Sequence, residues 1–157
     1  MTNKFFPVSI DLNNKNILVV GAGRVAYSKV MKMIAYGANI KVLTTEIEED
    51  KFYILDNEKI ISLIITKDEN NFDEKFLENI FLVVMATDNK EFNKKIAKIC
   101  IEKNILVNNI TSKDDMNLRF SSIYENDEYQ ISVSAYGNPK KSVEMKNRIK
   151  EFLEKDS

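Results

Sequence analysis

Residues Val19-Val20-Gly21-Ala22-Gly23-Arg24-Val25-Ala26 decide the fold predicted for this chain of 157 residues. The stretch 16–20, apolar from Ile17 onward, predicts a buried parallel strand. From Arg24 onward apolar residues recur at helical spacing until Gly37, which suits the left-handed position that ends a helix. The pattern is G-x-G-x-x-A, the Ala-ended form of the dinucleotide fingerprint. Strand, glycine turn and helix in this order predict nucleotide binding; the alternative is a strand-to-helix joint without a ligand.

Each residue of the fingerprint has a physical role in holding a dinucleotide. Gly21 permits the tight turn, Gly23 lets the backbone approach a pyrophosphate, and the small Ala26 allows close packing of helix on strand. Arg24 and Val25 open the helix, where exposed N–H groups and the helix dipole favour phosphate. These five residues form the predicted pyrophosphate site.

The end of the second predicted strand, 38–43, indicates which dinucleotide is bound. Thr44 and Glu46 follow it, at a place where NADP-dependent enzymes usually carry Arg or Lys for the 2′-phosphate. Glu46 would repel that phosphate and could accept a hydrogen bond from a ribose hydroxyl. NAD is therefore the favoured cofactor, although Glu46 could equally be an ordinary acid at a helix start.

Two later strand ends add candidate cofactor contacts. Thr87 and Asp88 follow the apolar strand 80–86, where a bound dinucleotide would pass, and Asn108 lies near the end of strand 105–110. Asp88 is also a candidate N-cap, because it stands at capping-box spacing from Glu91. The alternative for Asn108 is hydrogen bonding at the strand end.

Strands alternate with helices through the first part of the chain, which predicts a parallel sheet. A further strand is expected at 60–65, and helices at 46–56, 73–77 and 88–103. Residues 1–112 are therefore an α/β, Rossmann-like domain. Residues 113–157 differ: strands 118–124 and 129–135 form a β-hairpin, followed by a charged helix over 140–155. A hairpin and one helix bury little surface, so this segment is expected to be a dimerisation appendage.

Composition excludes several classes of site. The chain has no histidine and one cysteine, so a structural zinc site and internal disulfides are not expected. Cys100 lies on an apolar helix face and is interpreted as a core residue. No signal segment or apolar run long enough for a bilayer is visible, which favours a cytoplasmic protein without a membrane partner.

The net charge of −1 is unevenly distributed. Residues 46–78 hold eleven acids and four bases, a local charge of −7, so the rest of the chain carries +6. A solvated acidic face explains this simply, whereas a polyanionic ligand on the rest of the molecule is the sharper interpretation. No basic patch with interleaved aromatic residues suggests nucleic-acid binding.

Several motifs in order resemble the N-terminal dehydrogenase module of sirohaem synthases and the stand-alone precorrin-2 dehydrogenases. The similarity covers nearly the whole chain, and the ordered set is more specific than any single motif. The matching stretches are Phe5-Phe6-Pro7-Val8 with Ile10-Asp11-Leu12, Val20–Ala26 with Lys29, Gly37-Ala38, Leu82–Asp88, Leu106-Val107-Asn108, Phe120-Ser121-Ser122-Ile123, and Gly137-Asn138-Pro139 with Arg148-Ile149.

The resemblance implies NAD-dependent oxidation of precorrin-2, a polycarboxylate tetrapyrrole, to sirohydrochlorin, and in some members insertion of ferrous iron. The family places an aspartate three residues after the asparagine of its L-V-N motif, and Thr111 stands there in this chain. Asp114 or Asp115 could replace that carboxylate, or each could be an ordinary loop acid. We therefore expect dehydrogenase activity, but doubt iron insertion, because Thr111 cannot act as a carboxylate base.

Basic residues near the end of the chain are candidates for binding the substrate carboxylates, the alternative for each being a solvated surface charge. They are Arg119, Lys140, Lys141, Lys146 and Arg148. A different class also remains open, since small NAD-binding modules serve as non-catalytic sensors or regulatory domains.

Overall fold

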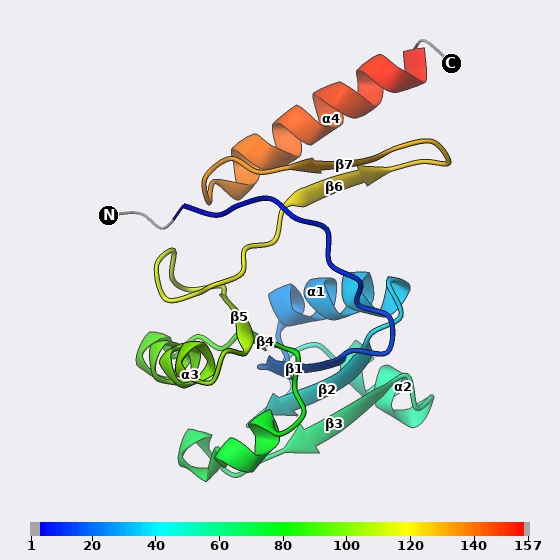
Figure 1. Ribbon diagram of the computed structural model, residues 1–157. Helices are drawn as coiled ribbons and strands as arrows, with labels where there is room; N and C mark the ends of the chain where they lie inside the picture. The colour runs from blue at the N-terminus through cyan, green and yellow to red at the C-terminus, as the bar shows by residue number, and fades with distance from the viewer. Residues whose placement is uncertain (1–3, 156–157) are drawn as a thin grey trace. The chain divides into compact units, whose positions relative to one another are not determined.

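The computed structural model describes residues 4–155 and divides the chain into two compact units after Leu118 (Figure 1). The first unit is a five-stranded sheet with helices, and the second is a hairpin with one helix. Within the described residues, no helix is both long and apolar enough to cross a bilayer.

The first unit contains a wholly parallel sheet in the order β3-β2-β1-β4-β5. Its strands are rich in Val, Ile and Leu because a parallel sheet is covered on both faces. They are β1 Asn16–Val20, β2 Asn39–Thr44, β3 Ile61–Ile65, β4 Leu82–Met85 and β5 Leu106–Asn109. This order confirms the Rossmann-like fold expected from the alternation of strands and helices.

Three α-helices connect the strands: α1 Arg24–Ala35, α2 Lys51–Asn57 and α3 Lys90–Glu102. Helix α1 ends as predicted, because Gly37 has a φ of +78° and its N–H donates to Ile34 O, while the Ala38 N–H donates to Met33 O. These two bonds form a Schellman motif. The helix predicted at 73–77 is a short 3-10 helix, Glu74–Leu77, and a second 3-10 helix, Glu69–Asn71, precedes it.

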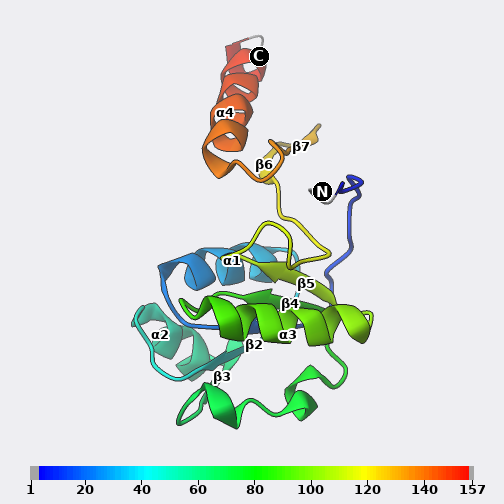
Figure 2. The same ribbon diagram turned by 90° about the vertical axis from the view of Figure 1, so that its left-hand side faces the viewer.

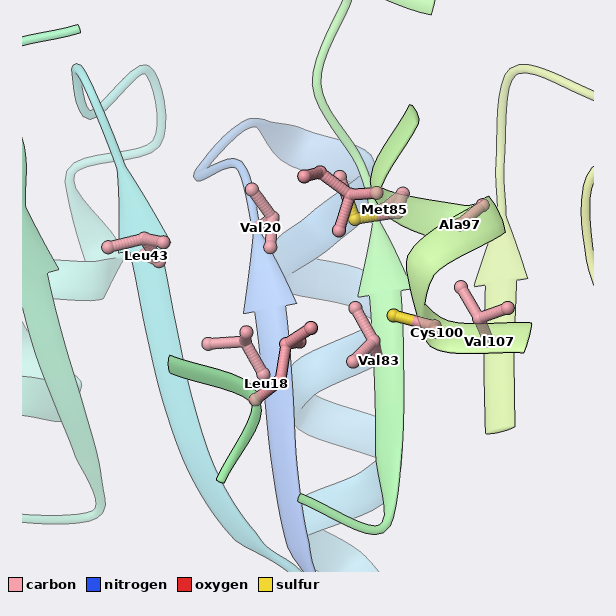
Figure 3. Close-up of a cluster of buried hydrophobic side chains, with 10 residues drawn as sticks. Leu18, Val20, Leu43, Val83, Met85, Ala97, Cys100 and Val107 are labelled. Carbon is pink, nitrogen blue, oxygen red and sulfur yellow. The ribbon is translucent and has the colours of Figure 1, made fainter. Parts of the chain in front are cut away.

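Helices cover both faces of the sheet. Figure 2 shows α1 and α3 on opposite faces, and the edge-to-face contact of Tyr27 with Phe52 places α2 beside α1. On the α3 face, Leu18, Val83 and Val107 pack with Cys100 in one buried cluster (Figure 3). Cys100 is fully buried, as expected, and burial raises the pKa of its thiol to about 12.

The first unit extends six residues beyond the predicted boundary at 112, because the loop after β5 folds back on that strand. The N–H groups of Asn117 and Leu118 both donate to Val107 O, and the Asn117 side chain bonds Val107 N and Ile105 O. Loop residues that bond to a strand of the sheet belong to its unit. No signal in the local sequence marks this return.

The second unit consists of strands β6 Ser122–Glu125 and β7 Gln130–Val133, paired antiparallel, and helix α4 Pro139–Lys155. Asn138 caps α4, since its Oδ1 accepts from the Lys141 N–H. Of the residues described between 119 and 155, only Tyr124 and Ser142 are buried. This unit therefore has almost no interior of its own.

Candidate functional site

A cavity of about 470 Å³ lies at the carboxyl ends of β1, β2 and β4. Its lining comes from the glycine-rich turn, from the segments that follow β2, β3 and β4, and from Ile110 just after β5. The strand order reverses between β1 and β4, and ligands of open α/β sheets bind at such a switch point. The cavity is therefore where the fold itself predicts a ligand.

Gly21 makes the turn out of β1, and no other residue fits there. Its φ is +109°, and an added β-carbon would lie 2.5 Å from the carbonyl oxygen of Ala86. Its N–H donates to Leu43 O at 2.8 Å, which fastens the turn to the end of β2. The role predicted for Gly21 is thus matched by its geometry.

Gly23 is the N-cap of α1, and this helix start suits a pyrophosphate. No side chain caps the first N–H groups and no acid lies in the first turn. Gly23, Arg24 and Val25 line the cavity, whereas Ala26 is fully buried against the sheet. A pyrophosphate fits here because the uncapped N–H groups and the dipole favour an anion and no β-carbon stands in its way.

The segment after β2 differs from its prediction. A helix was expected over 46–56, but α2 begins at Lys51, because the N–H groups of Glu48 and Glu49 both donate to Ala22 O at 3.2 Å. These bonds hold the segment as a loop against the glycine-rich turn. The Thr44 hydroxyl donates to Glu46 O at 2.6 Å in the same loop.

Glu48 is a site residue that sequence reasoning missed. Its exposed carboxylate borders the cavity, with Oε2 3.1 Å from the position of a β-carbon added at Gly23. Glu46, the residue predicted to contact a ribose, also lines the cavity. In all, the lining holds one cation, Arg24, and five acids: Glu46, Glu48, Asp68, Glu69 and Asp88.

Thr87 and Asp88 line the cavity beyond β4, but Asp88 is not the N-cap of α3. The cap is Asn89, whose Oδ1 accepts from the Phe92 N–H at 3.0 Å, so the predicted capping box with Glu91 is wrong by one residue. The Asn89 side-chain amide also donates to the Glu69 carboxylate. This tertiary bond adds a second partner for Asn89 that local spacing could not reveal.

A hydrogen-bonded group links the ends of β4 and β5. The fully buried Asn93 accepts from Thr87 Oγ1 at 2.6 Å and donates to Thr87 O at 2.8 Å and Thr111 Oγ1 at 3.0 Å. Thr111 in turn donates from both its N–H and its hydroxyl to Asn109 Oδ1. Sequence reasoning missed Asn93 and Asn109, although Asn93 stands among apolar neighbours on the buried face of α3.

The candidate catalytic residues and Asn108 are not part of the cavity lining. Asn108 donates to Leu118 O at 3.1 Å, which corresponds to the strand-end role given as its alternative. The Asp115 carboxylate accepts from Ser112 Oγ, and that oxygen accepts from the N–H groups of Asp114 and Asp115. The two acids thus share one turn that begins just after Thr111.

The basic candidates all lie in the second unit. Lys140 and Lys141 are exposed in the first turn of α4, and Arg148 is exposed further along it, with Lys146 half-buried. The Arg119 guanidinium lies beside Gly137, 3.6 Å from the position of an added β-carbon. Residues 119–157 hold seven bases and seven acids, so these cations lie in a unit without net charge.

Comparison with known proteins agrees with the geometry. Residues 8–122 match the family model described as putative NAD(P)-binding. The chain is 34% identical over 133 residues to the siroheme synthase of Buchnera aphidicola, covering 85% of this chain and 27% of that protein. It is 32% identical over 126 residues to the probable multifunctional siroheme biosynthesis protein HemA of Ruminiclostridium josui, covering 78% and 23%. The chain thus spans about a quarter of the length of these relatives.

Among solved structures, SirC, a precorrin-2 dehydrogenase, is similar over both units. The TM-score is 0.75 at 25% sequence identity, covering 98% of this chain and 71% of that one. The likeness therefore includes the hairpin and helix as well as the parallel sheet.

Proposed function

This chain belongs to the putative NAD(P)-binding family, and we propose from that premise that it is an NAD-dependent precorrin-2 dehydrogenase of sirohaem biosynthesis. The observation that carries the proposal is the likeness to a precorrin-2 dehydrogenase over 98% of the chain. The similarity to siroheme synthases supports the same pathway. The glycine-rich cradle supplies the cofactor site that such a reaction requires.

NAD rather than NADP fits the charge of the cavity. Five acids and one arginine line it, and Glu46 and Glu48 follow the strand whose end usually selects the ribose substituent. A 2′-phosphate would add negative charge beside these carboxylates. Gly23, Arg24 and Val25 would hold the pyrophosphate through backbone N–H groups, and Thr87 would contact the dinucleotide at the end of β4.

The reaction removes one hydride and one proton from precorrin-2. NAD⁺ supplies the hydride acceptor when bound, and the protein supplies binding and orientation. Thr111 has no carboxylate, so the proton passes to Asp114, Asp115 or water. Iron insertion is not part of the proposal. That reaction must also remove the pyrrole protons, and this chain has Thr111 where the family resemblance places a carboxylate.

The substrate would be held through its carboxylates by the basic residues of the second unit. Arg119, Lys140 and Lys141 lie near the start of α4, and Lys146 and Arg148 lie on the helix. Such pairing would act locally between cationic side chains and carboxylates, because residues 119–157 hold seven bases and seven acids and the positive balance outside residues 46–78 comes from the rest of the chain.

A homodimer formed through the second unit would bury apolar side chains that this unit leaves exposed. Ile123, Val143, Met145 and Phe152 are exposed large apolar residues in a unit that buries only Tyr124 and Ser142 among its described residues. A two-stranded hairpin needs further packing to be stable.

The cysteine content agrees with a protein of the reducing cytoplasm, because the chain has a single cysteine, Cys100, and this residue is buried.

Anaerobic incubation with precorrin-2 and NAD⁺ tests the proposal. Appearance of the sirohydrochlorin spectrum together with NADH is the expected result. Omitting NAD⁺ should abolish the change, and NADP⁺ should replace it poorly. Tight binding of NAD⁺ without any turnover would instead favour a sensor or regulatory module and refute the dehydrogenase.

A further inference from the structure

Asn93 uses every hydrogen-bonding atom of its side chain although the residue is fully buried. Its Nδ2 donates to Thr87 O and to Thr111 Oγ1, and its Oδ1 accepts from Thr87 Oγ1. The amide cannot be reversed, because Thr87 O only accepts and must face the nitrogen. The position of Asn93 Oδ1 is therefore determined.

This orientation decides the polarity of the Thr87 hydroxyl. A hydroxyl has one proton, and Thr87 donates it to Asn93 Oδ1 at 2.6 Å. Its remaining capacity is to accept, and the Asn89 N–H approaches one lone pair at 3.3 Å. Because Thr87 lines the cavity, a ligand atom that bonds this oxygen must be a donor.

We propose that Asn93 is a positioning residue that turns Thr87 into a hydrogen-bond acceptor for an N–H or O–H group of the bound dinucleotide. The proposal rests on the proposed function, since it needs NAD⁺ in the cavity. Two groups of NAD⁺ have the required chemistry: the carboxamide NH₂ of the nicotinamide and the ribose hydroxyls.

The same asparagine fixes Thr111. Thr111 Oγ1 accepts from Asn93 Nδ2 at 3.0 Å and donates to Asn109 Oδ1 at 2.9 Å. Asn93 on α3 thereby joins the residue after β4 to the loop after β5. Asn93, Thr111 and Asn109 do not line the cavity themselves, but they hold the hydroxyl of Thr87, which is a lining residue.

Calorimetric titration with NAD⁺ and with its 3-acetylpyridine analogue, a ketone without the NH₂ group, tests the polarity. If the carboxamide is the donor, the wild-type protein should prefer NAD⁺ by about 3- to 10-fold, the range of one neutral hydrogen bond. Thr87→Val should lose that preference, and Thr87→Ser, which keeps the hydroxyl, should restore it. If Thr87→Val weakens both dinucleotides equally, a ribose hydroxyl is the donor and the acceptor role still holds. Unchanged affinity for both would overturn it.

Asn93→Ala tests the positioning role, with Asn117→Ala as the matched control. Asn93→Ala removes the acceptor of the Thr87 proton, so the hydroxyl is free to rotate. The affinity difference that depends on Thr87, whether between NAD⁺ and its analogue or between proteins with and without Thr87→Val, should then disappear although the hydroxyl is still present. Asn117→Ala removes the side-chain hydrogen bonds to Val107 N and Ile105 O, and Asn117 does not line the cavity. This control should lower Tm without changing the affinity difference that depends on Thr87. An equal change in the control would overturn the positioning role.

Binding of NAD⁺ by the wild-type protein shows whether a negative result concerns the proposed function or only the positioning role of Asn93. A wild-type protein that binds neither dinucleotide overturns the proposed function and this proposal together. Binding of NAD⁺ that ignores every substitution at Thr87 and Asn93 overturns the positioning proposal alone.

Discussion

Replacing each fingerprint glycine by alanine should separate folding from cofactor binding. At Gly21 a β-carbon would lie 2.5 Å from Ala86 O, and φ is +109°, so Gly21→Ala must strain its own backbone or shift that of Ala86. Such strain costs roughly 2–3 kcal/mol. In a domain of this size the loss should lower Tm by roughly 4–12 °C.

Gly23→Ala should behave in the opposite way. Gly23 has φ −90° and ψ −178°, and an added β-carbon meets only the carboxylate end of the exposed Glu48 side chain, within 4 Å. Stability should change by no more than about 0.5 kcal/mol. The methyl group, however, would occupy the approach of the pyrophosphate. Loss of two charge-assisted bonds, about 1.5–3 kcal/mol each, should weaken NAD⁺ at least about 100-fold.

Thermal unfolding without ligand and calorimetric titration with NAD⁺ measure the two effects on both variants. Gly23→Val should abolish binding for the same reason as Gly23→Ala. Wild-type affinity in Gly23→Ala would refute the assignment of the pyrophosphate cradle. An unchanged Tm in Gly21→Ala would refute the argument from strain.

Three further predictions concern the proton route, the charge of the cavity and the core. If no carboxylate serves the wild-type enzyme, Thr111→Asp should raise NADH formation, since a positioned base contributes roughly 10²–10⁴-fold. If Asp114 or Asp115 serves as the base, its Asp→Asn variant should instead lower the rate of NADH formation by a comparable factor. An unchanged rate in all three variants would mean that the proton passes to solvent. Glu48→Gln should tighten NAD⁺ binding by up to about 5-fold, because a screened surface charge next to the phosphates is removed, and the gain should shrink with added salt; calorimetry at two ionic strengths checks this. The Cys100 thiol, with its pKa raised to about 12, should resist alkylation at pH 8 until denaturant is added, and rapid labelling of the folded protein would contradict its burial.

The elements that sequence predicts best are those whose signals are local and agree with one another. Strand β1 has the predicted bounds, and Gly37 ends α1 in the expected left-handed conformation. Cys100 lies in the core because every fourth or third residue of its helix is apolar. In each case one short segment carries the complete physical cause.

Bonds between distant segments explain the differences. Asn89, not Asp88, caps α3, and it also bonds Glu69, twenty residues away in the chain. The loop after β5 remains with the first unit because Asn117 returns to Val107 and Ile105. Spacing rules treat a candidate cap or loop alone and therefore cannot weigh such partners.

The candidate site divides in the same way. The glycine spacing, the strand before it and the acid after β2 follow from the order of residues, because turn geometry and helix dipoles act within one βα unit. The carboxylate of Glu48 beside Gly23, and the bonds of Asn93 to Thr87 and Thr111, exist only after β1, β2, β4 and β5 lie side by side. Sequence alone thus determined the glycine-rich turn and the uncapped helix start that line the cavity. Folding decided which side chains surround it and which way their hydrogen bonds point, because these depend on distances between segments that the chain order does not contain.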